Sequence, residues 1–289
     1  MLIPQSRSLG ILLVLASAVV WSTAGVFTRM AELDVWTMIG WRSLFSALLL
    51  GAFCGLRRRA GSARPIDGAE IVSAVMGAVG GITYVMALTW TTVANVMTIY
   101  ATLPFVATIL AYLWLHERVT ARFATAGLIA FLGVVVMVGA SFAPRDLMGI
   151  LAAAAMTLSF ASQLVISRRY PQMDSLRMVT LAALLCLLAA LPMMRPALPE
   201  GRALLACALY GGFSTGLGYV LVLAGSRIIG AAEAGLLSML DVIMGPLWVW
   251  LFYAERITPA TALGGGTVFA AMLWYLAGGR RGSTRPQPG

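Results

Sequence analysis

The sequence WLHERVT at residues 114–120 returns as FYAERIT at residues 252–258, 138 residues later. Two similar stretches at a fixed distance indicate an internal duplication of the chain. The first copy is predicted to cover residues 1–141 and the second copy residues 142–278. Residues 279–289 (GRRGSTRPQPG) contain no apolar run and are expected to form a disordered tail.

Other residues are related by a similar offset, which extends the duplication to nearly the whole chain. Trp21 aligns with Phe160 at an offset of 139 residues. Tyr84 aligns with Tyr219 if the offset is three residues shorter than 138. The two copies are therefore expected to have the same architecture with small differences in length.

The composition of the chain is that of a membrane protein. Sixty per cent of its 289 residues are hydrophobic, 11% are charged, and the mean hydropathy is +0.90. A soluble domain of this length carries about 25% charged residues. A lipid bilayer accommodates the excess apolar surface, and about 20 apolar residues form a helix long enough to cross it. We therefore expect an all-α membrane protein that has the bilayer as its main partner.

Apolar runs separated by short polar segments predict ten transmembrane helices. The predicted spans are residues 9–28, 37–56, 71–90, 93–115, 123–141, 147–167, 178–194, 203–225, 231–253 and 260–277. Each copy holds five spans, and because five is odd, the second copy enters the membrane from the opposite side. Inverted repeats of this kind are how many secondary transporters place two gates around one site near the membrane midplane.

The charge distribution predicts the orientation of the chain. Its net charge of +9 rests on twenty arginines, with no lysine. A soluble protein this basic would suggest a nucleic-acid partner. In a membrane protein, however, basic residues collect in cytoplasmic loops. With an internal N-terminus, fourteen arginines fall in inside segments and five in outside segments. Both termini are therefore expected in the cytoplasm, and no nucleic-acid partner is expected.

Several residues resemble a known transporter family. They are Trp21 and Ser22 in the first span, Arg42 in the second, Pro104 in the fourth, and ERVT at residues 117–120. The stretch LDVIMGPLWVW at residues 240–250, followed by ERIT, looks similar. Together these motifs resemble the EamA-like branch of the drug/metabolite transporter superfamily, and most closely its aromatic and neutral amino-acid exporters. The resemblance implies ten helices, a bacterial inner (cytoplasmic) membrane and outward movement of small metabolites.

The second copy departs from the family pattern at two points. Phe160 stands where the family often has a tryptophan. Pro104 precedes Glu117 by thirteen residues, whereas Pro246 precedes Glu255 by nine. Because proline bends a helix at its own position, the fourth and ninth spans are expected to bend at different depths. The two glutamates are expected to cap the helices that follow them.

The sequence lacks the residue patterns that ATP-driven transport, metal binding and enzymatic catalysis require. No GxxxxGKS or GxxxxGKT motif occurs, so ATP-driven transport by this chain alone is not expected. The single histidine, His116, stands at a predicted membrane edge and is interpreted as interfacial. Cys54, Cys186 and Cys207 lie inside apolar runs and are interpreted as small core residues. Neither a metal site, nor a cofactor, nor an enzymatic activity is predicted.

Two ionisable residues lie well inside predicted spans, where charge is costly and points to function. Arg42 could bind a carboxylate through two hydrogen bonds; it could instead hold neighbouring helices through carbonyl groups or reach the outer interface. Asp241 could bind an ammonium group, carry a coupling proton or pair with an arginine, Arg42 among them. Glu233 is shallower and is interpreted as interfacial.

Aromatic and uncharged polar residues complete the predicted pathway, because aromatic faces attract ammonium groups and stack on flat side chains. The predicted substrate pathway comprises Trp21, Arg42, Tyr84, Tyr100, Gln163, Ser214, Tyr219, Asp241 and Trp248. Further candidates are Phe160, Ser162, Thr215 and Trp250. Their alternative role is to mark the membrane interface or to join helices.

These features predict a secondary transporter that exports a small polar metabolite by alternating access and acts as a monomer. An aromatic or neutral amino acid is the expected substrate, since one buried cation and one buried anion suit a zwitterion. Another metabolite or drug class, a permeation channel and an integral-membrane enzyme are the alternatives. A channel would usually need a symmetric oligomeric pore, and an enzyme would need a polar cluster near one face, which the sequence lacks.

Overall fold

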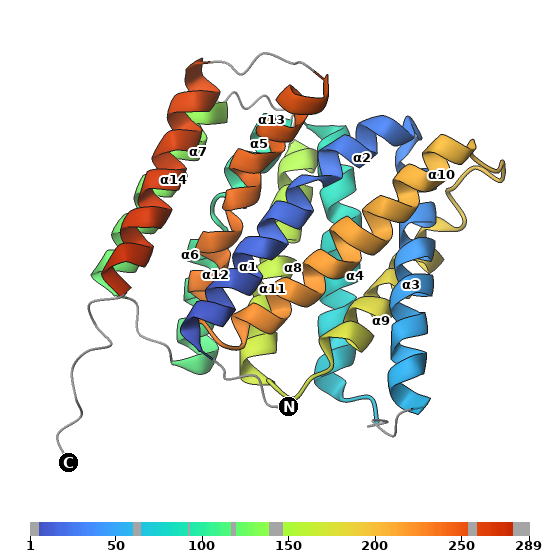
Figure 1. Ribbon diagram of the computed structural model, residues 1–289, viewed down its shortest axis with the longest axis horizontal. Coiled ribbons are helices and arrows are strands. Elements are labelled where there is room, and N and C mark those ends of the chain that lie inside the picture. The colour runs from blue at the N-terminus through green and yellow to red at the C-terminus, as the bar shows by residue number, and fades with distance from the viewer. Residues whose placement is uncertain are drawn as a thin grey trace.

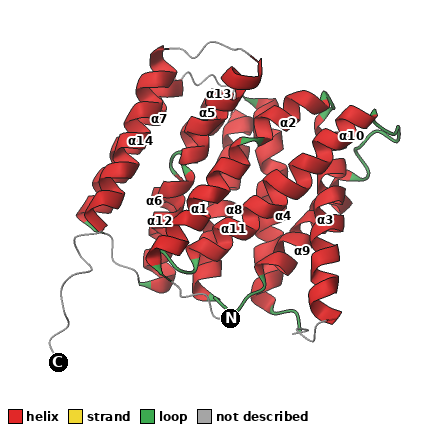
Figure 2. Ribbon diagram, in the orientation of Figure 1, coloured by secondary structure: helices red, strands yellow, loops and turns green. Residues whose placement is uncertain are grey.

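The computed structural model describes residues 6–59, 65–91, 93–116, 120–138, 147–253 and 259–279. All regular structure in these segments is helical, which confirms the all-α prediction (Figure 2). Six helices are long and apolar enough to cross a membrane, and four shorter apolar helices accompany them. Figure 1 shows these helices side by side, with short connections between them at the two ends of the molecule.

The helices follow the predicted spans in both repeats. The first repeat contains α1 (Arg7–Ser22), α2 (Ala24–Ala31), α3 (Val35–Arg59), α4 (Gly68–Trp90), α5 (Val93–Tyr100), α6 (Leu103–Leu115) and α7 (Ala121–Val138). The second contains α8 (Leu147–Arg169), α9 (Ser175–Ala190), α10 (Gly201–Ala208), the π-helix η2 (Leu209–Leu217), α11 (Gly218–Ser226), α12 (Ala231–Ser238), α13 (Leu240–Tyr253) and α14 (Pro259–Gly279). Ten spans result, as predicted, because some neighbouring helices together form one span. These are α1–α2, α5–α6, α10–η2–α11 and α12–α13.

Two interrupted helices occupy equivalent places in the two repeats. The break between α5 and α6 and the break between α12 and α13 are 138 residues apart, which is the offset of the sequence repeat. The expectation that these spans bend at different depths is therefore wrong. Pro104 lies in the first turn of α6, where its missing N–H is not needed. Ser238 bonds to the carbonyl of Ala234, a contact that bends helices, and α13 continues through residue 246.

Several residues at the span ends are exposed. His116 ends α6 in the left-handed conformation (φ 54°) and is exposed, and its position at the membrane edge stays a prediction. Trp90 and Trp114 are also exposed. The predicted caps Glu117 and Glu255, and the predicted tail beyond residue 279, lie outside the described residues.

The fifth and tenth spans, α7 and α14, pack against each other at one edge of the molecule (Figure 1). Their backbones approach closely at Gly133, where a Cβ atom would lie 2.8 Å from the carbonyl oxygen of Gly264. Arg122 on α7 donates a hydrogen bond to the carbonyl of Trp274 and lies 4.5 Å from the centre of its ring. Small residues commonly allow such close contact between helices in lipid.

Gly133→Ala should lower the melting temperature of the detergent-solubilised protein, because the added methyl group overlaps the Gly264 carbonyl. Overpacking of this kind costs about 1–3 kcal/mol. Gly266→Ala is the matched control on α14, since a Cβ atom there meets nothing within 4 Å. Circular dichroism on heating measures both variants, and equal melting temperatures would contradict close packing at Gly133.

A cavity between the repeats with an arginine and an aspartate in its wall

A cavity of about 150 Å³ lies between the helices of the two repeats. Its wall takes residues from the first four spans of each repeat. Among the described residues, none that lines it comes from α7 or α14. The cavity is therefore built at the junction of the two copies, and the paired edge helices stay outside it.

The cavity brings together most of the residues predicted for the substrate pathway. Those that line it are Trp21, Arg42, Tyr84, Tyr100, Gln163, Ser214, Tyr219 and Asp241, together with the further candidates Phe160 and Thr215. Trp248 does not line it, because its indole N–H donates to the hydroxyl of Ser22 at 2.7 Å and joins α13 to α1. Ser162 bonds to a carbonyl of its own helix, and Trp250 is exposed. Whether these residues contact a substrate stays a prediction.

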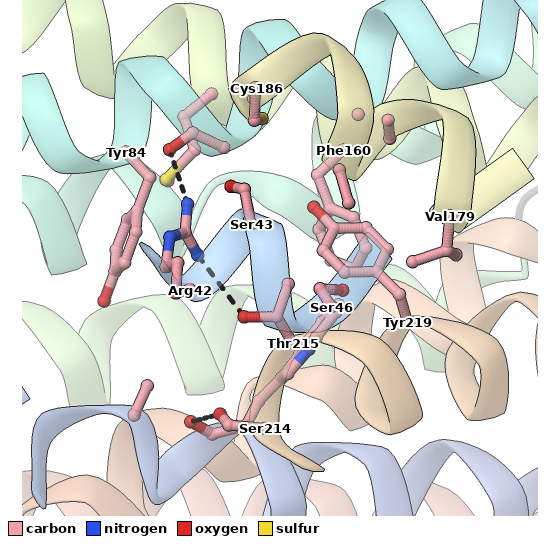
Figure 3. Close-up of a pocket in the computed structure, with 18 of the residues that line it drawn as sticks. Arg42, Ser43, Ser46, Tyr84, Phe160, Val179, Cys186, Ser214, Thr215 and Tyr219 are labelled. Atoms are coloured by element: carbon pink, nitrogen blue, oxygen red, sulfur yellow. Dashed lines mark hydrogen bonds between the residues drawn. The ribbon is translucent and has the colours of Figure 1, made fainter. Parts of the chain in front are cut away.

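Arg42 is the buried cation of the cavity wall, with 5% of its surface exposed. Its guanidinium group donates to the hydroxyl of Thr215 and to the carbonyl of Gly81, both at 3.3 Å (Figure 3). It also lies 5.0 Å from the ring centre of Tyr210. The Nε atom is buried without a hydrogen-bond partner, and no carboxylate of the described residues forms an ion pair with Arg42.

A π-helical turn positions the groups around this arginine. Tyr210, Ser214 and Thr215 all belong to η2 and line the cavity. At Gly211 a Cβ atom would collide with the backbone carbonyl of Arg42, so a residue without a side chain lets η2 approach α3 this closely. Short π-helical segments inside longer helices occur frequently at functional sites.

Asp241 is the acidic group of the cavity wall and lies in the first turn of α13. Its Oδ1 atom is buried and has no hydrogen-bond partner. The side chain of Tyr100 interacts with its carboxyl group. Asp241 forms no ion pair with Arg42, so the pairing considered from the sequence is absent. The cavity thus contains a cationic and an acidic group that each keep unused hydrogen-bonding capacity.

Four aromatic rings form one side of the cavity. Trp21 contacts Phe160 and Tyr219 edge to face, with ring centres 5.0 and 4.8 Å apart. Phe160 also lies 6.4 Å from the ring of Tyr100, nearly parallel to it. Figure 3 shows Phe160 and Tyr219 on one side of Arg42 and Tyr84 on the other. An apolar, aromatic surface therefore lies close to the buried cation.

Gln163 closes another part of the wall. Its amide nitrogen donates to the backbone carbonyl of Ser73 at 2.9 Å, which links α8 to α4. Its Oε1 atom is buried and has no partner. A Cβ atom at Gly77 would lie 2.6 Å from the amide nitrogen, so this glycine makes room for the glutamine side chain.

The sequence prediction missed three polar residues of the wall, namely Ser43, Ser46 and Tyr210. Helical spacing could have indicated Ser46, because it lies four residues after Arg42 and so on the same face. No sequence signal distinguishes Tyr210 from an ordinary buried tyrosine. Cys186, predicted to be a core residue, is buried as expected and also lines the cavity.

An all-helical membrane protein with two inverted repeats and a central cavity between them has the architecture of a secondary transporter. The model of the EamA-like transporter family matches residues 8–139 and again residues 147–277. The chain therefore belongs to the EamA-like transporter family and is a membrane transporter of the drug/metabolite transporter type.

Comparison with solved structures supports the fold. One, described only as "Crystal structure of protein", is 20% identical and superposes with a TM-score of 0.80. The alignment covers 94% of this chain and 99% of the other. At this level of identity the likeness concerns the fold alone. No curated protein matches the chain.

Proposed function

We propose that this transporter exports amino acids from the bacterial cytoplasm by alternating access. The observation that carries the proposal is the presence of Arg42 and Asp241 in the wall of one cavity without an ion pair between them. A zwitterion offers a carboxylate to the first and an ammonium group to the second. Buried charges are costly unless they are paired, and a bound zwitterion supplies both partners at once.

The aromatic side of the cavity supports an aromatic or neutral amino acid as the substrate. Trp21, Phe160, Tyr219 and Tyr100 offer ring faces and edges to an apolar side chain. Aromatic pairs gain about 0.5–1.5 kcal/mol beyond the burial of their area. No second cationic side chain lines the cavity among the described residues, which disfavours substrates that carry several negative charges.

The repeat architecture supports alternating access. The interrupted spans α5–α6 and α12–α13 occupy equivalent positions, and the cavity lies between the two copies. Inverted copies can exchange conformations, so that the cavity opens first to one face and then to the other. The excess of arginine in predicted inside loops supports cytoplasmic termini in an inner membrane. A functional monomer is part of the proposal, because the two repeats that line the cavity belong to the same chain.

Counterflow in liposomes tests the proposal. Proteoliposomes loaded with unlabelled L-phenylalanine should take up external radiolabelled L-phenylalanine in a saturable manner, and faster than liposomes loaded with buffer. Protein-free liposomes measure the leak. A flux that is linear in concentration and accompanied by electrical current would indicate a channel. An absence of counterflow with L-phenylalanine, L-leucine and L-threonine alike would exclude the proposed substrate class.

A further inference from the structure

A buried ion pair connects the two repeats at one end of the molecule. Arg177 in the first turns of α9 donates two hydrogen bonds to Glu70 in the first turn of α4, each 2.6 Å long. Only 3% of the Glu70 side chain and 11% of the Arg177 side chain are exposed. The backbone N–H of Asp174 adds a third hydrogen bond to Glu70 at 3.0 Å.

This ion pair lies at the end of the cavity towards the face where α1 and α4 begin, the lower face in Figure 1. Arg177 directly precedes Met178, which lines the cavity. On α4, Gly77 lines the cavity about two helical turns after Glu70. Between these levels, Gln163 links α8 to α4. The cavity is thus separated from the lower face first by the Gln163 amide and then by the ion pair.

The opposite end has a weaker connection. There Arg195 contacts Asp34 at 3.3 Å, with 77% and 31% of the two side chains exposed. Partial burial raises the pKa of Asp34, but hydrogen bonds from Thr37 and the charge of Arg195 outweigh it, so the pKa lies below its usual value. Exposed ion pairs contribute little to stability because water solvates the separated charges almost as well.

A buried ion pair is poorly suited to hold a protein together, since the loss of hydration nearly cancels the attraction between the charges. It is well suited to a switch for the same reason. When the helices separate and water enters, both charges recover their hydration. Paired and separated states can therefore be close in free energy, whereas removing one partner leaves a buried charge uncompensated and disfavours the closed state.

We propose that the Glu70–Arg177 pair is the gate at the end of the cavity where α1 begins. It is closed in this structure and separates when the cavity opens to that face. The inference rests on the proposed alternating access, but it does not depend on the identity of the substrate.

The thiol of Cys186 lines the cavity and reports on the gate. In a Cys54→Ser/Cys207→Ser background it is the only cysteine left in the chain. A membrane-impermeant maleimide is applied to vesicles of each orientation, and the rate of labelling is measured. Glu70→Gln and Arg177→Gln should each raise the labelling rate at least about tenfold from the face bearing the N-terminus. The charge swap Glu70→Arg/Arg177→Glu should restore protection.

Glu233→Gln is the matched control, because it removes a more exposed ion pair, with Arg7 at 2.7 Å, from the same end of the molecule. It should leave the labelling rate unchanged. Unchanged labelling in both single variants would overturn the gate. Faster labelling from both faces would also overturn it, since this would indicate general loosening of the fold. The readout involves no transported substrate, so failed amino-acid counterflow and a failed gate are separate results.

Discussion

Replacing Arg42 with glutamine should weaken the binding of L-phenylalanine by about 100-fold. Arg42 is 5% exposed, and its guanidinium group has no acidic partner among the described residues. A substrate carboxylate would therefore form a desolvated, charge-assisted contact, and losing one partner of such a contact costs about 2–5 kcal/mol. A factor of 100 corresponds to about 2.8 kcal/mol, within that range. Arg42→Lys should give an intermediate loss, because lysine keeps the charge but not the planar pair of donors.

The comparison that isolates this role uses phenethylamine, which is L-phenylalanine without its carboxylate. Calorimetric titration of the purified wild-type protein should show a strong preference for the amino acid. Arg42→Gln should abolish that preference. Arg202→Gln is the control, because Arg202 is exposed on α10. If Arg42→Gln binds both compounds as the wild type does, Arg42 serves only to hold Thr215 and Gly81 in place.

Asp241→Asn should produce the complementary loss. The variant should bind L-phenylalanine about 100-fold more weakly than the wild type, for the same reason of lost charge compensation. Its affinity for 3-phenylpropionate, which lacks the ammonium group, should change little. The melting temperature should change little, because the asparagine oxygen can still accept from Tyr100, while the desolvated acid, whose Oδ1 atom has no hydrogen-bond partner, is removed. Binding sites commonly retain such destabilising groups for function.

Glu233→Gln is the control for Asp241→Asn, since Glu233 precedes Asp241 on the same span but does not line the cavity. It should leave both affinities unchanged. If the Asp241→Asn variant binds L-phenylalanine as tightly as the wild type does, Asp241 is not the ammonium-binding group. If such a variant also lost the pH dependence of transport, Asp241 would instead carry a coupling proton.

The ten spans could be predicted because the bilayer imposes a simple rule on the chain. Backbone groups in lipid must bond within their own helix, so a span requires about 20 apolar residues in a row. The predicted span 147–167 and the observed α8 (Leu147–Arg169) illustrate how closely composition follows structure. The duplication was equally visible, because both copies kept residue types at span ends that differ from the apolar background.

The breaks inside the spans could not be predicted in the same way, since they depend on hydrogen bonds rather than hydropathy. The first span was expected to be continuous but is divided at Thr23, whose hydroxyl bonds to the carbonyl of Val20. The predicted span 203–225 contains the π-helix η2, and its apolar pattern does not distinguish that geometry from an α-helix. Pro104 stands directly after the break between α5 and α6, whereas Pro246 lies inside α13, seven residues after the break between α12 and α13, and was a misleading guide.

The candidate site was largely visible from the sequence, because charged, aromatic and amide side chains in the middle of spans stand out. Trp248 shows the limit of that reasoning. It lies two helical turns after Asp241 and so on the same face of α13. Seven residues correspond to about 10 Å along the helix axis, however, and at that distance its indole meets Ser22 instead of the cavity. The part of a span that reaches the cavity depends on how the helices pack against one another. The residue pattern of one span alone does not predict that packing.

The π-helix also makes the two copies unequal in structure. Two identical inverted copies would exchange roles, and the inward-facing and outward-facing states would then have the same free energy. The span that contains η2 has no π-helical counterpart in α4, its equivalent among the described residues of the first repeat. Under the proposed alternating access, the two facing states are therefore not expected to be mirror images, and the empty carrier is expected to prefer one of them before any substrate binds. A bias of this kind would come from a helical irregularity next to Arg42, not from a gradient across the membrane.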